Sequence, residues 1–292
     1  MNKKITVKID KDLNGCDIKS ILRNHIRLSS TLLKRLKRTD NGILLNGEAV
    51  NVLRTVCAGD ELVLTLCDEN SDNIVPKNIS ICILYEDEDI IAVNKPRSMP
   101  THPSHNHYED TLANGIMYYF KDMEFTFRAI TRLDRDTSGV VLVAKNPLSA
   151  QILSDEMKNK RIHKEYIAVV NGVPELRCGT ISVPIKRREN SVMLRCAAPD
   201  GREAITEYEV EKTFGGLSLV RLRPVTGRTH QLRVHMSYMN TPIYGDDLYG
   251  APQKNEQTRL HCNKISFYHP LTKEKITVTA PIPKDITILI KK

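Results

Sequence analysis

The chain is organised around one stretch, Arg128-Ala-Ile-Thr-Arg-Leu-Asp134-Arg-Asp-Thr-Ser-Gly139-Val-Val-Leu-Val-Ala144. Its apolar residues 140–144 predict a short buried strand, and the polar residues before them predict a bend. A carboxylate, that of Asp134, is therefore expected at the mouth of a strand between Arg132 and Arg135. This placement suits chemistry on an anion. The alternative is a solvated bend in which the arginines neutralise the acidic side chains.

Length and charge limit the classes of protein to consider. The 292 residues suit a small domain followed by a large one, and 43 Lys and Arg against 35 Asp and Glu give a formal charge of +8. That excess is compatible with a polyanionic partner. The seven cysteines are scattered and never spaced as Cys-x-x-Cys, which predicts reduced thiols and neither disulfides nor a zinc site. With no signal-like start and no membrane-spanning apolar run, we expect a soluble cytoplasmic protein.

The first 70 residues predict a small α/β unit. An alternating strand over 3–9 is followed by a helix capped by Asp17 and a second helix after Ser29. A hairpin at 42–47 and a strand at 61–66 complete the unit. The second helix is basic, and its candidate RNA contacts are Lys34, Arg35 and Arg38. This order of elements resembles the S4-type RNA-binding module; a basic face on a purely structural domain is the alternative.

The rest of the chain alternates short strands and helices. Polar, turn-rich residues predict a linker over 71–79, so we expect an N-terminal domain at 1–70 and a second domain at 80–292. Within the second domain, apolar patterns predict helices and strands at several places. Strands are expected at 81–85, 90–94, 140–144 and 164–170, helices at 110–121 and 149–159, short strands from 178 to 208, and a hairpin near the C-terminus.

Several blocks of the second domain resemble one family. Arg132-Leu-Asp-Arg-Asp-Thr-Ser-Gly139 is similar to the signature of the RluA-like RNA pseudouridine synthases. So are Lys164-x-Tyr166-x-Ala168 and Gly227-Arg-Thr-His-Gln-Leu-Arg-Val-His235, and the blocks follow in the family's order from about 80 to 283. Two positions depart from the pattern: Ser98 stands where glycine is common, and Thr131 where histidine is usual.

The resemblance implies a fold and an activity. The expected fold is α+β, a pseudouridine synthase fold with a mixed, mainly antiparallel sheet, behind the S4-like domain. The implied reaction breaks the N1 glycosidic bond of a uridine, turns the uracil and joins its C5 to the ribose, without cofactor. Asp134 would be the catalytic carboxylate, Tyr166 the active-site tyrosine, and Arg233 the cation that pairs with Asp134. Attack at C1′ of the ribose and attack at the base both remain open.

Other side chains are expected to meet RNA. Arg132 is placed to fill the space left by the unstacked uridine. Arg228, His230 and Gln231 project from one compact segment and are candidate RNA contacts. For His230 and His235 a structural pair of hydrogen-bonding histidines is the preferred interpretation, and no carboxylate or cysteine nearby completes a metal site. Asp136, the second acidic residue of the central stretch, is expected to be structural.

The favoured function is therefore an RNA pseudouridine synthase acting on large-subunit ribosomal RNA, with transfer RNA as the alternative substrate. A ribosome-assembly protein that keeps the scaffold without catalysis is the second class. A metal- or phosphate-dependent hydrolase using Asp134 and Asp136 is the third, and it lacks a ligand set and a Gly-rich phosphate loop. We expect RNA as partner, a monomer, no metal and no membrane.

Overall fold

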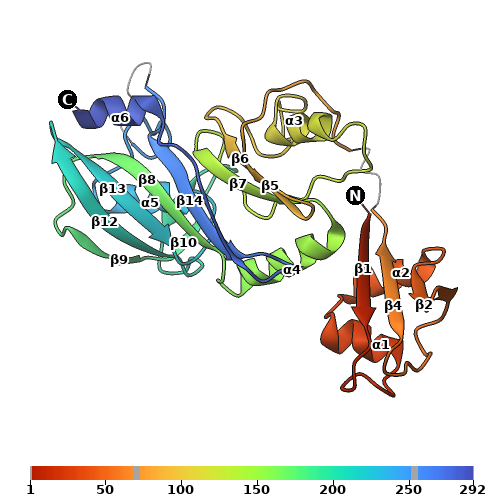
Figure 1. Ribbon diagram of the computed structural model, residues 1–292. Coiled ribbons are helices and arrows are strands. Elements are labelled where there is room, and N and C mark those ends of the chain that lie inside the picture. Colours follow the sequence, from red (N-terminus) through yellow and green to blue (C-terminus); the bar gives the residue numbers. More distant parts are fainter. Residues whose placement is uncertain (1, 69–72, 251–255, 292) are drawn as a thin grey trace.

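The computed structural model describes residues 2–68, 73–250 and 256–291. Within them the strands form a 4-stranded sheet, a 9-stranded sheet and a 2-stranded ribbon. The small sheet belongs to the N-terminal part and the large sheet to the remainder, and they stand side by side in Figure 1. None of the described helices is long and apolar enough to cross a membrane.

The N-terminal part follows the sequence expectation closely. Its strands run in the order β1-β4-β2-β3, and both expected helix starts are capped. The side chain of Asp17 accepts from the Ser20 N–H, and that of Ser29 accepts from the Leu32 N–H. The first helix, expected as far as Ile26, is a short α-turn continued by a π-helical turn. The elements are β1 (Lys3–Lys8), α1 (Ile18–Ser20), η1 (Ile21–His25), α2 (Ser30–Arg38), β2 (Ile43–Leu45), β3 (Glu48–Ala49) and β4 (Glu61–Leu66).

The large sheet confirms the expected α+β class with a mixed, mainly antiparallel sheet. Its order is β5-β6-β7-β14-β8-β13-β12-β9, with β15 paired to β14. Among the described residues, β7 and β14 pair in parallel, and the other pairings of this sheet are antiparallel. The strands are β5 (Ile83–Glu86), β6 (Ile90–Lys95), β7 (Ser138–Ala144), β8 (His163–Asn171), β9 (Cys178–Ser182), β12 (Ile205–Phe214), β13 (Leu217–Pro224), β14 (Leu260–Tyr268) and β15 (Lys275–Thr279).

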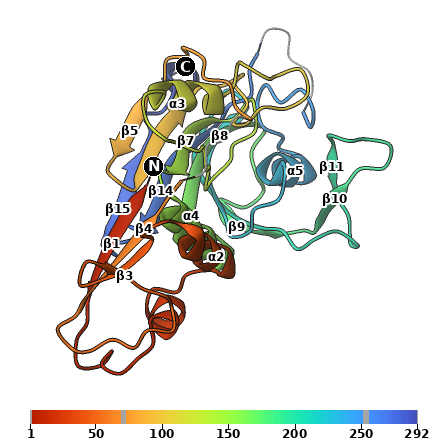
Figure 2. The ribbon, with the colours of Figure 1, turned by 90° about the vertical axis from the view of Figure 1, so that its right-hand side faces the viewer.

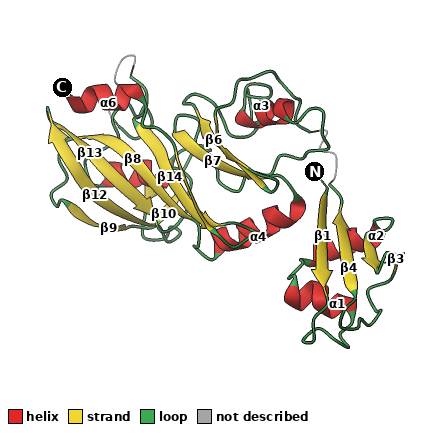
Figure 3. Ribbon diagram, viewed as in Figure 1, coloured by secondary structure: helices red, strands yellow, loops and turns green. Residues whose placement is uncertain are grey.

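The helices of the second part lie around this sheet. α6 lies at one end of the sheet and α4 at the other (Figure 3). The ribbon of β10 (Ile185–Arg187) and β11 (Arg195–Ala197) stands out from the sheet beyond α5 (Figure 2). α6 was not anticipated. The helices are α3 (Leu112–Tyr119), α4 (Pro147–Lys158), α5 (Gln231–Tyr238) and α6 (Lys284–Lys291).

Strand β7 is an internal strand of the large sheet, between β6 and β14. All seven of its residues are buried, as a strand covered on both faces requires. Gly139 lies opposite Cys262 of β14 and has φ +115, and a Cβ built on it would lie 2.2 Å from the Cys262 carbonyl oxygen. Only glycine allows so close an approach. The loop that carries Asp134 therefore enters a strand whose position is fixed by contact with β14.

The two parts also pack against each other. Leu148 of α4 belongs to the hydrophobic cluster of the N-terminal part, with Ile152 and Leu271 packed beside it. The Gln151 side chain accepts from the Ser29 N–H at 2.7 Å and donates to the Arg27 carbonyl at 2.8 Å. Apolar burial together with hydrogen bonds at both ends of one amide favours a single arrangement over a tethered pair of domains.

Part of the expected linker, residues 71 and 72, lies outside the described residues. The described remainder, 73–79, forms no helix or strand and lies along α3. The Asn114 side chain donates to the Val75 carbonyl at 2.8 Å, and the Lys77 N–H donates to the Asn114 carbonyl at 3.1 Å. These bonds attach the segment to the second part.

Candidate active site

The loop before β7 presents Asp134 with about a third of its side chain, 32%, exposed. The Thr137 N–H donates to the Asp134 carbonyl at 3.1 Å and closes a turn. On the preceding side, the Thr101 hydroxyl donates to the Leu133 carbonyl at 2.9 Å. The backbone on both sides of Asp134 is thus held by hydrogen bonds, while its carboxylate stays accessible.

Lys95 binds the backbone of this loop on the other side of Asp134, at Arg135. Its ammonium is fully buried and donates to the carbonyls of Pro96, Met99 and Arg135 at 2.9, 2.7 and 3.0 Å. Burial lowers the pKa of Lys95 to about 7, and the charges of Asp136 and Asp134 oppose that shift. Three carbonyl acceptors need all three N–H bonds of the ammonium form. Lys95 therefore positions the backbone one residue after Asp134.

The strand β8 carries Tyr166, which is 6% exposed and faces Cys262 in the register of β8 with β14. Burial raises the pKa of Tyr166 well above its usual value, and the Cys262 side chain and the charge of Asp134 act in the same direction. The phenol is neutral in the resting protein.

Arg233 departs from expectation. Its guanidinium forms a two-pronged ion pair with Asp246, with Nε–Oδ2 at 2.7 Å and Nη2–Oδ1 at 2.6 Å, and Nη2 lies 3.5 Å from Asp247. No ion pair joins Arg233 to Asp134 in the described residues. The expected direct pair is therefore corrected. The reason is burial: an arginine that is 3% exposed needs a carboxylate buried with it, and Asp246 is fully buried.

Asp134 still acts on Arg233 at longer range. Burial lowers the pKa of Arg233, but the hydrogen bond and charge of Asp246 outweigh this and hold it above its usual value, and the charge of Asp134 adds to them. Asp246 and Tyr249, whose ring lies 5.2 Å from the guanidinium, were missed as site residues. A buried carboxylate after Gly245 gives no local signal of its partner, because that partner is 13 residues away on α5.

His230 lies beside the carboxylate. Its Nε2 is 4.0 Å from the Asp134 Oδ2, and its Nδ1 is 2.7 Å from the Tyr249 hydroxyl. Burial lowers the pKa of His230, and the charge of Asp134 opposes this. His235 is fully buried between the Thr206 hydroxyl at 2.9 Å and the Val183 carbonyl at 3.0 Å. The two histidines thus differ: His235 is structural, and His230 faces the site.

Gln231 requires a further correction. Its amide oxygen accepts from the Thr226 hydroxyl at 2.8 Å and the Arg228 N–H at 2.9 Å, and its amide nitrogen donates to Ile205 and Thr206. With the side chain 4% exposed, no amide group is left for RNA. Gln231 therefore shapes the loop before α5, while Arg228 stays exposed with its Nε on the Glu203 carbonyl at 2.9 Å.

The remaining candidates occupy two places. Arg132 is exposed next to the loop, and its charge contributes to a lowered pKa of His102, for which burial is the larger cause. On α2, Lys34 and Arg38 are exposed and Arg35 is half-buried. Asp136 forms an ion pair with Arg135, with Nε–Oδ1 at 3.2 Å, and this contact agrees with a structural role.

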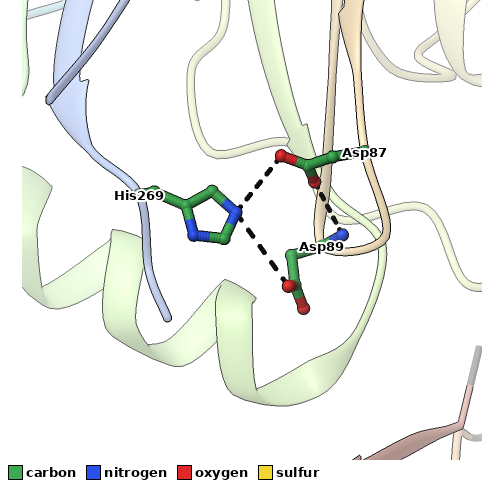
Figure 4. Close-up of side chains that lie close together, drawn as sticks. All are labelled: Asp87, Asp89 and His269. Carbon is green, nitrogen blue, oxygen red and sulfur yellow. Dashed lines mark hydrogen bonds and ion pairs between the residues drawn. The ribbon is translucent and has the colours of Figure 1, made fainter. Parts of the chain in front are cut away.

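One group of possible metal ligands occurs among the described residues, away from Asp134: Asp87, Asp89 and His269, with ligand atoms within 4.8 Å of one another (Figure 4). The His269 Nδ1 accepts from the Leu271 and Thr272 N–H groups at 3.3 and 3.0 Å. Its ring proton is therefore on Nε2, the atom that faces Asp87 at 3.2 Å. A metal needs that nitrogen unprotonated, so the group acts as a hydrogen-bond network in which a neutral His269 donates to the Asp87 carboxylate.

Comparison with known proteins places this geometry in a family. The family described as RNA pseudouridylate synthase matches residues 89–238, which include Asp134, Tyr166 and Arg233. The chain belongs to the RNA pseudouridylate synthase family. Within the family it is of the RluA-like type.

Relatives and solved structures agree. The chain is 38% identical over 268 residues to the uncharacterized RNA pseudouridine synthase YjbO of Bacillus subtilis (strain 168), covering 90% of this chain and 95% of that protein. It is 39% identical over 231 residues to ribosomal large subunit pseudouridine synthase D of Borreliella burgdorferi, covering 75% and 71%. Human RNA pseudouridylate synthase domain containing 1 superimposes with a TM-score of 0.61 at 28% identity, covering 70% and 84%.

Proposed function

We propose that this protein isomerises specific uridines of large-subunit ribosomal RNA to pseudouridine, with Asp134 as the catalytic carboxylate. One observation carries the proposal: a partly exposed carboxylate on a loop braced from both sides, with the His230 ring 4.0 Å from it. Relatives named as ribosomal large subunit pseudouridine synthase D support ribosomal RNA over transfer RNA. Such a substrate would place the protein in the cytoplasm.

In the reaction the N1–C1′ bond breaks, a C5–C1′ bond forms, C5 loses its proton and N1 gains one. Asp134 would either add covalently or stabilise positive charge at the sugar. Attack at C1′ and attack at the base both fit a carboxylate in this position. Arg233 would act indirectly, because its ion pair with Asp246 fixes a positive charge near the site instead of contacting Asp134.

Tyr166 is proposed to lie against the uracil ring and to assist loss of the C5 proton. Its phenol starts out neutral, because burial raises its pKa. For this group to accept the C5 proton, the phenol must first lose its own proton, so its pKa would have to fall when RNA binds. A role limited to stacking needs no such change, and replacing the hydroxyl separates the two roles.

The uridine must leave its stack to reach a loop inside the protein surface, at a cost of a few kcal/mol. Arg132 is exposed next to Asp134 and is proposed to occupy the vacated space. We further propose that residues 1–70 are an S4-like RNA-binding domain whose α2 contributes Lys34, Arg35 and Arg38 to phosphates, and that 80–292 are the catalytic domain.

The proposal is tested by mapping pseudouridines in ribosomal and transfer RNA from cells that lack the gene. We expect particular uridines of large-subunit RNA to lose the modification, and wild-type protein to restore it while Asp134→Asn does not. Loss only in transfer RNA would correct the substrate. Full restoration by Asp134→Asn would favour the alternative of a scaffold without catalysis. Undiminished activity in EDTA would argue against the metal-dependent hydrolase.

A further inference from the structure

Lys164 stands beside Tyr166 without a counter-charge. The two residues are separated by one position on β8, and alternate residues of a strand share a face. Between them, Glu165 takes the other face and pairs with Lys264 at 3.1 Å and Arg223 at 3.0 Å. The Lys164 ammonium has no hydrogen-bond or ion-pair partner within the described residues, although the backbone of Lys164 pairs with Ile265 of β14. The cation on the Tyr166 face is therefore the unpaired one.

The neighbours of the Lys164 ammonium are uncharged. Burial raises the pKa of Cys262, whose thiol interacts with Lys164, to about 11, so it stays protonated at neutral pH. Tyr166 is likewise neutral. Desolvation lowers the pKa of Lys164, although its side chain keeps partial exposure.

The ammonium also reaches the loop that leads to His230. A Cβ placed on Gly227 would lie 3.9 Å from the Lys164 Nζ, and no closer heavy atom surrounds that position. His230 is the third residue after Gly227, and its Nε2 is 4.0 Å from the Asp134 Oδ2. Lys164 thus lies between β8 and the loop before α5, on the side of the sheet that carries the catalytic candidates.

An unpaired, partly desolvated ammonium destabilises the free protein, so its retention points to a ligand that supplies the missing charge. We propose that Lys164 binds a phosphate of the RNA strand next to the target uridine, an inference that rests on the proposed function. Tyr166 is buried deeper than Lys164, so a nucleotide entering base first would bring its base to Tyr166 and its backbone to Lys164. RNA offers an anion at every linkage, whereas the uracil carbonyls are neutral.

The test uses the full chain and a synthetic RNA stem-loop that carries the uridine identified by the mapping, with tritium at C5, whose release reports turnover. Lys164→Met is expected to raise KM about tenfold or more with kcat nearly unchanged. The slope of log(kcat/KM) against log[KCl] should become shallower by about 0.7–0.9. Lys164→Arg should keep the wild-type slope. Lys264→Met removes the same charge from the opposite face and is the matched control, expected to behave as wild type.

A second measurement changes the RNA instead of the protein. Replacing one phosphate at a time by an uncharged methylphosphonate should reproduce the KM increase at one linkage beside the target in wild type, and add nothing further in Lys164→Met. A lowered kcat with unchanged KM and salt slope, no effect of Lys164→Met, or no sensitive linkage would overturn the phosphate assignment. Absence of tritium release from wild type would instead remove the proposed function. Without RNA, Lys164→Met should unfold at the same temperature as wild type or higher.

Discussion

Tyr166 has two proposed roles, stacking on the uracil and assisting loss of the C5 proton, and only the second needs its hydroxyl. Replacing it by Phe keeps the ring at the base and removes the group that could move a proton. We expect Tyr166→Phe to lower kcat by about 100-fold while KM changes little, because a positioned proton-transfer group contributes on that order. Single-turnover tritium release measures it. Near wild-type kcat for Tyr166→Phe, together with a large loss for Tyr166→Ala, would limit Tyr166 to stacking.

Lys95 makes stability depend on pH. Its pKa is lowered to about 7 by burial from an unfolded value of 10.5, so the unfolded chain binds the proton more tightly. Its contribution to the free energy of unfolding therefore rises with pH between those two values, by about 2 kcal/mol from pH 7 to 9. The free energy of unfolding in urea, measured for wild type and for Lys95→Met at each pH, should differ by an amount that shows this rise. A difference that stays flat over that range would mean that the three carbonyls keep Lys95 charged.

Ser98 shows how one departure from the family pattern is accommodated. It adopts φ +59, a left-handed conformation that costs a non-glycine residue on the order of 1 kcal/mol. That conformation explains why glycine is common there. Thr131, the other departure, accepts from the Leu142 N–H at 2.9 Å and so has taken a structural role.

At the scale of elements, the Arg233–Asp246 pair ties α5 to the segment after it. Asp246→Asn leaves a buried arginine without its countercharge and should lower the free energy of unfolding by about 3–5 kcal/mol. Asp247→Asn is the control. The Asp247 side chain is 62% exposed and loses only one contact, that of its Oδ1 with the Arg233 Nη2 at 3.5 Å, so the free energy of unfolding should change by no more than about 0.5 kcal/mol. Chemical denaturation compares them. Equal losses in both variants would contradict the larger role of the buried Asp246 carboxylate.

At the scale of the whole molecule, the N-terminal part is docked through α4. Leu148→Ala combined with Gln151→Ala removes the apolar contact and both hydrogen bonds of that amide. We expect a larger radius of gyration in X-ray scattering, because the parts separate, and a stability loss of about 2–5 kcal/mol from Leu148. Leu153→Ala, on the same helix but in the core of the second part, should cost as much without changing the radius. An unchanged radius in the double variant would mean that contacts other than those of α4 suffice to hold the two parts together.

Such docking would matter for the reaction. The RNA contacts on α2 and at Asp134 would then be separated by one fixed distance. The N-terminal part would thereby set how far the target uridine lies from the segment of RNA bound by α2. The pairs of Lys3 with Asp89 at 2.9 Å and of Asp68 with Arg128 join the two parts at further points. A free linker would impose no such spacing.

Local sequence determined much of this protein. Apolar periodicity and capping residues predicted β1, α2, β7 and β8 to within a few residues, because those elements depend on neighbours in the chain. The bend before β7 and the exposure of Asp134 also followed from a polar run entering an apolar strand. These features need no knowledge of what packs against them.

The partners of buried polar groups were decided only by the tertiary structure. Arg233 pairs with Asp246, Gln231 uses its whole amide inside the loop, and Lys164 is left unpaired beside two neutral groups. Each outcome depends on segments that the sheet brings together, as β7 and β14 meet across more than 100 residues. The sequence determined which side chains carry charge, whereas burial in the folded chain determined which charges are neutralised and which remain for a substrate.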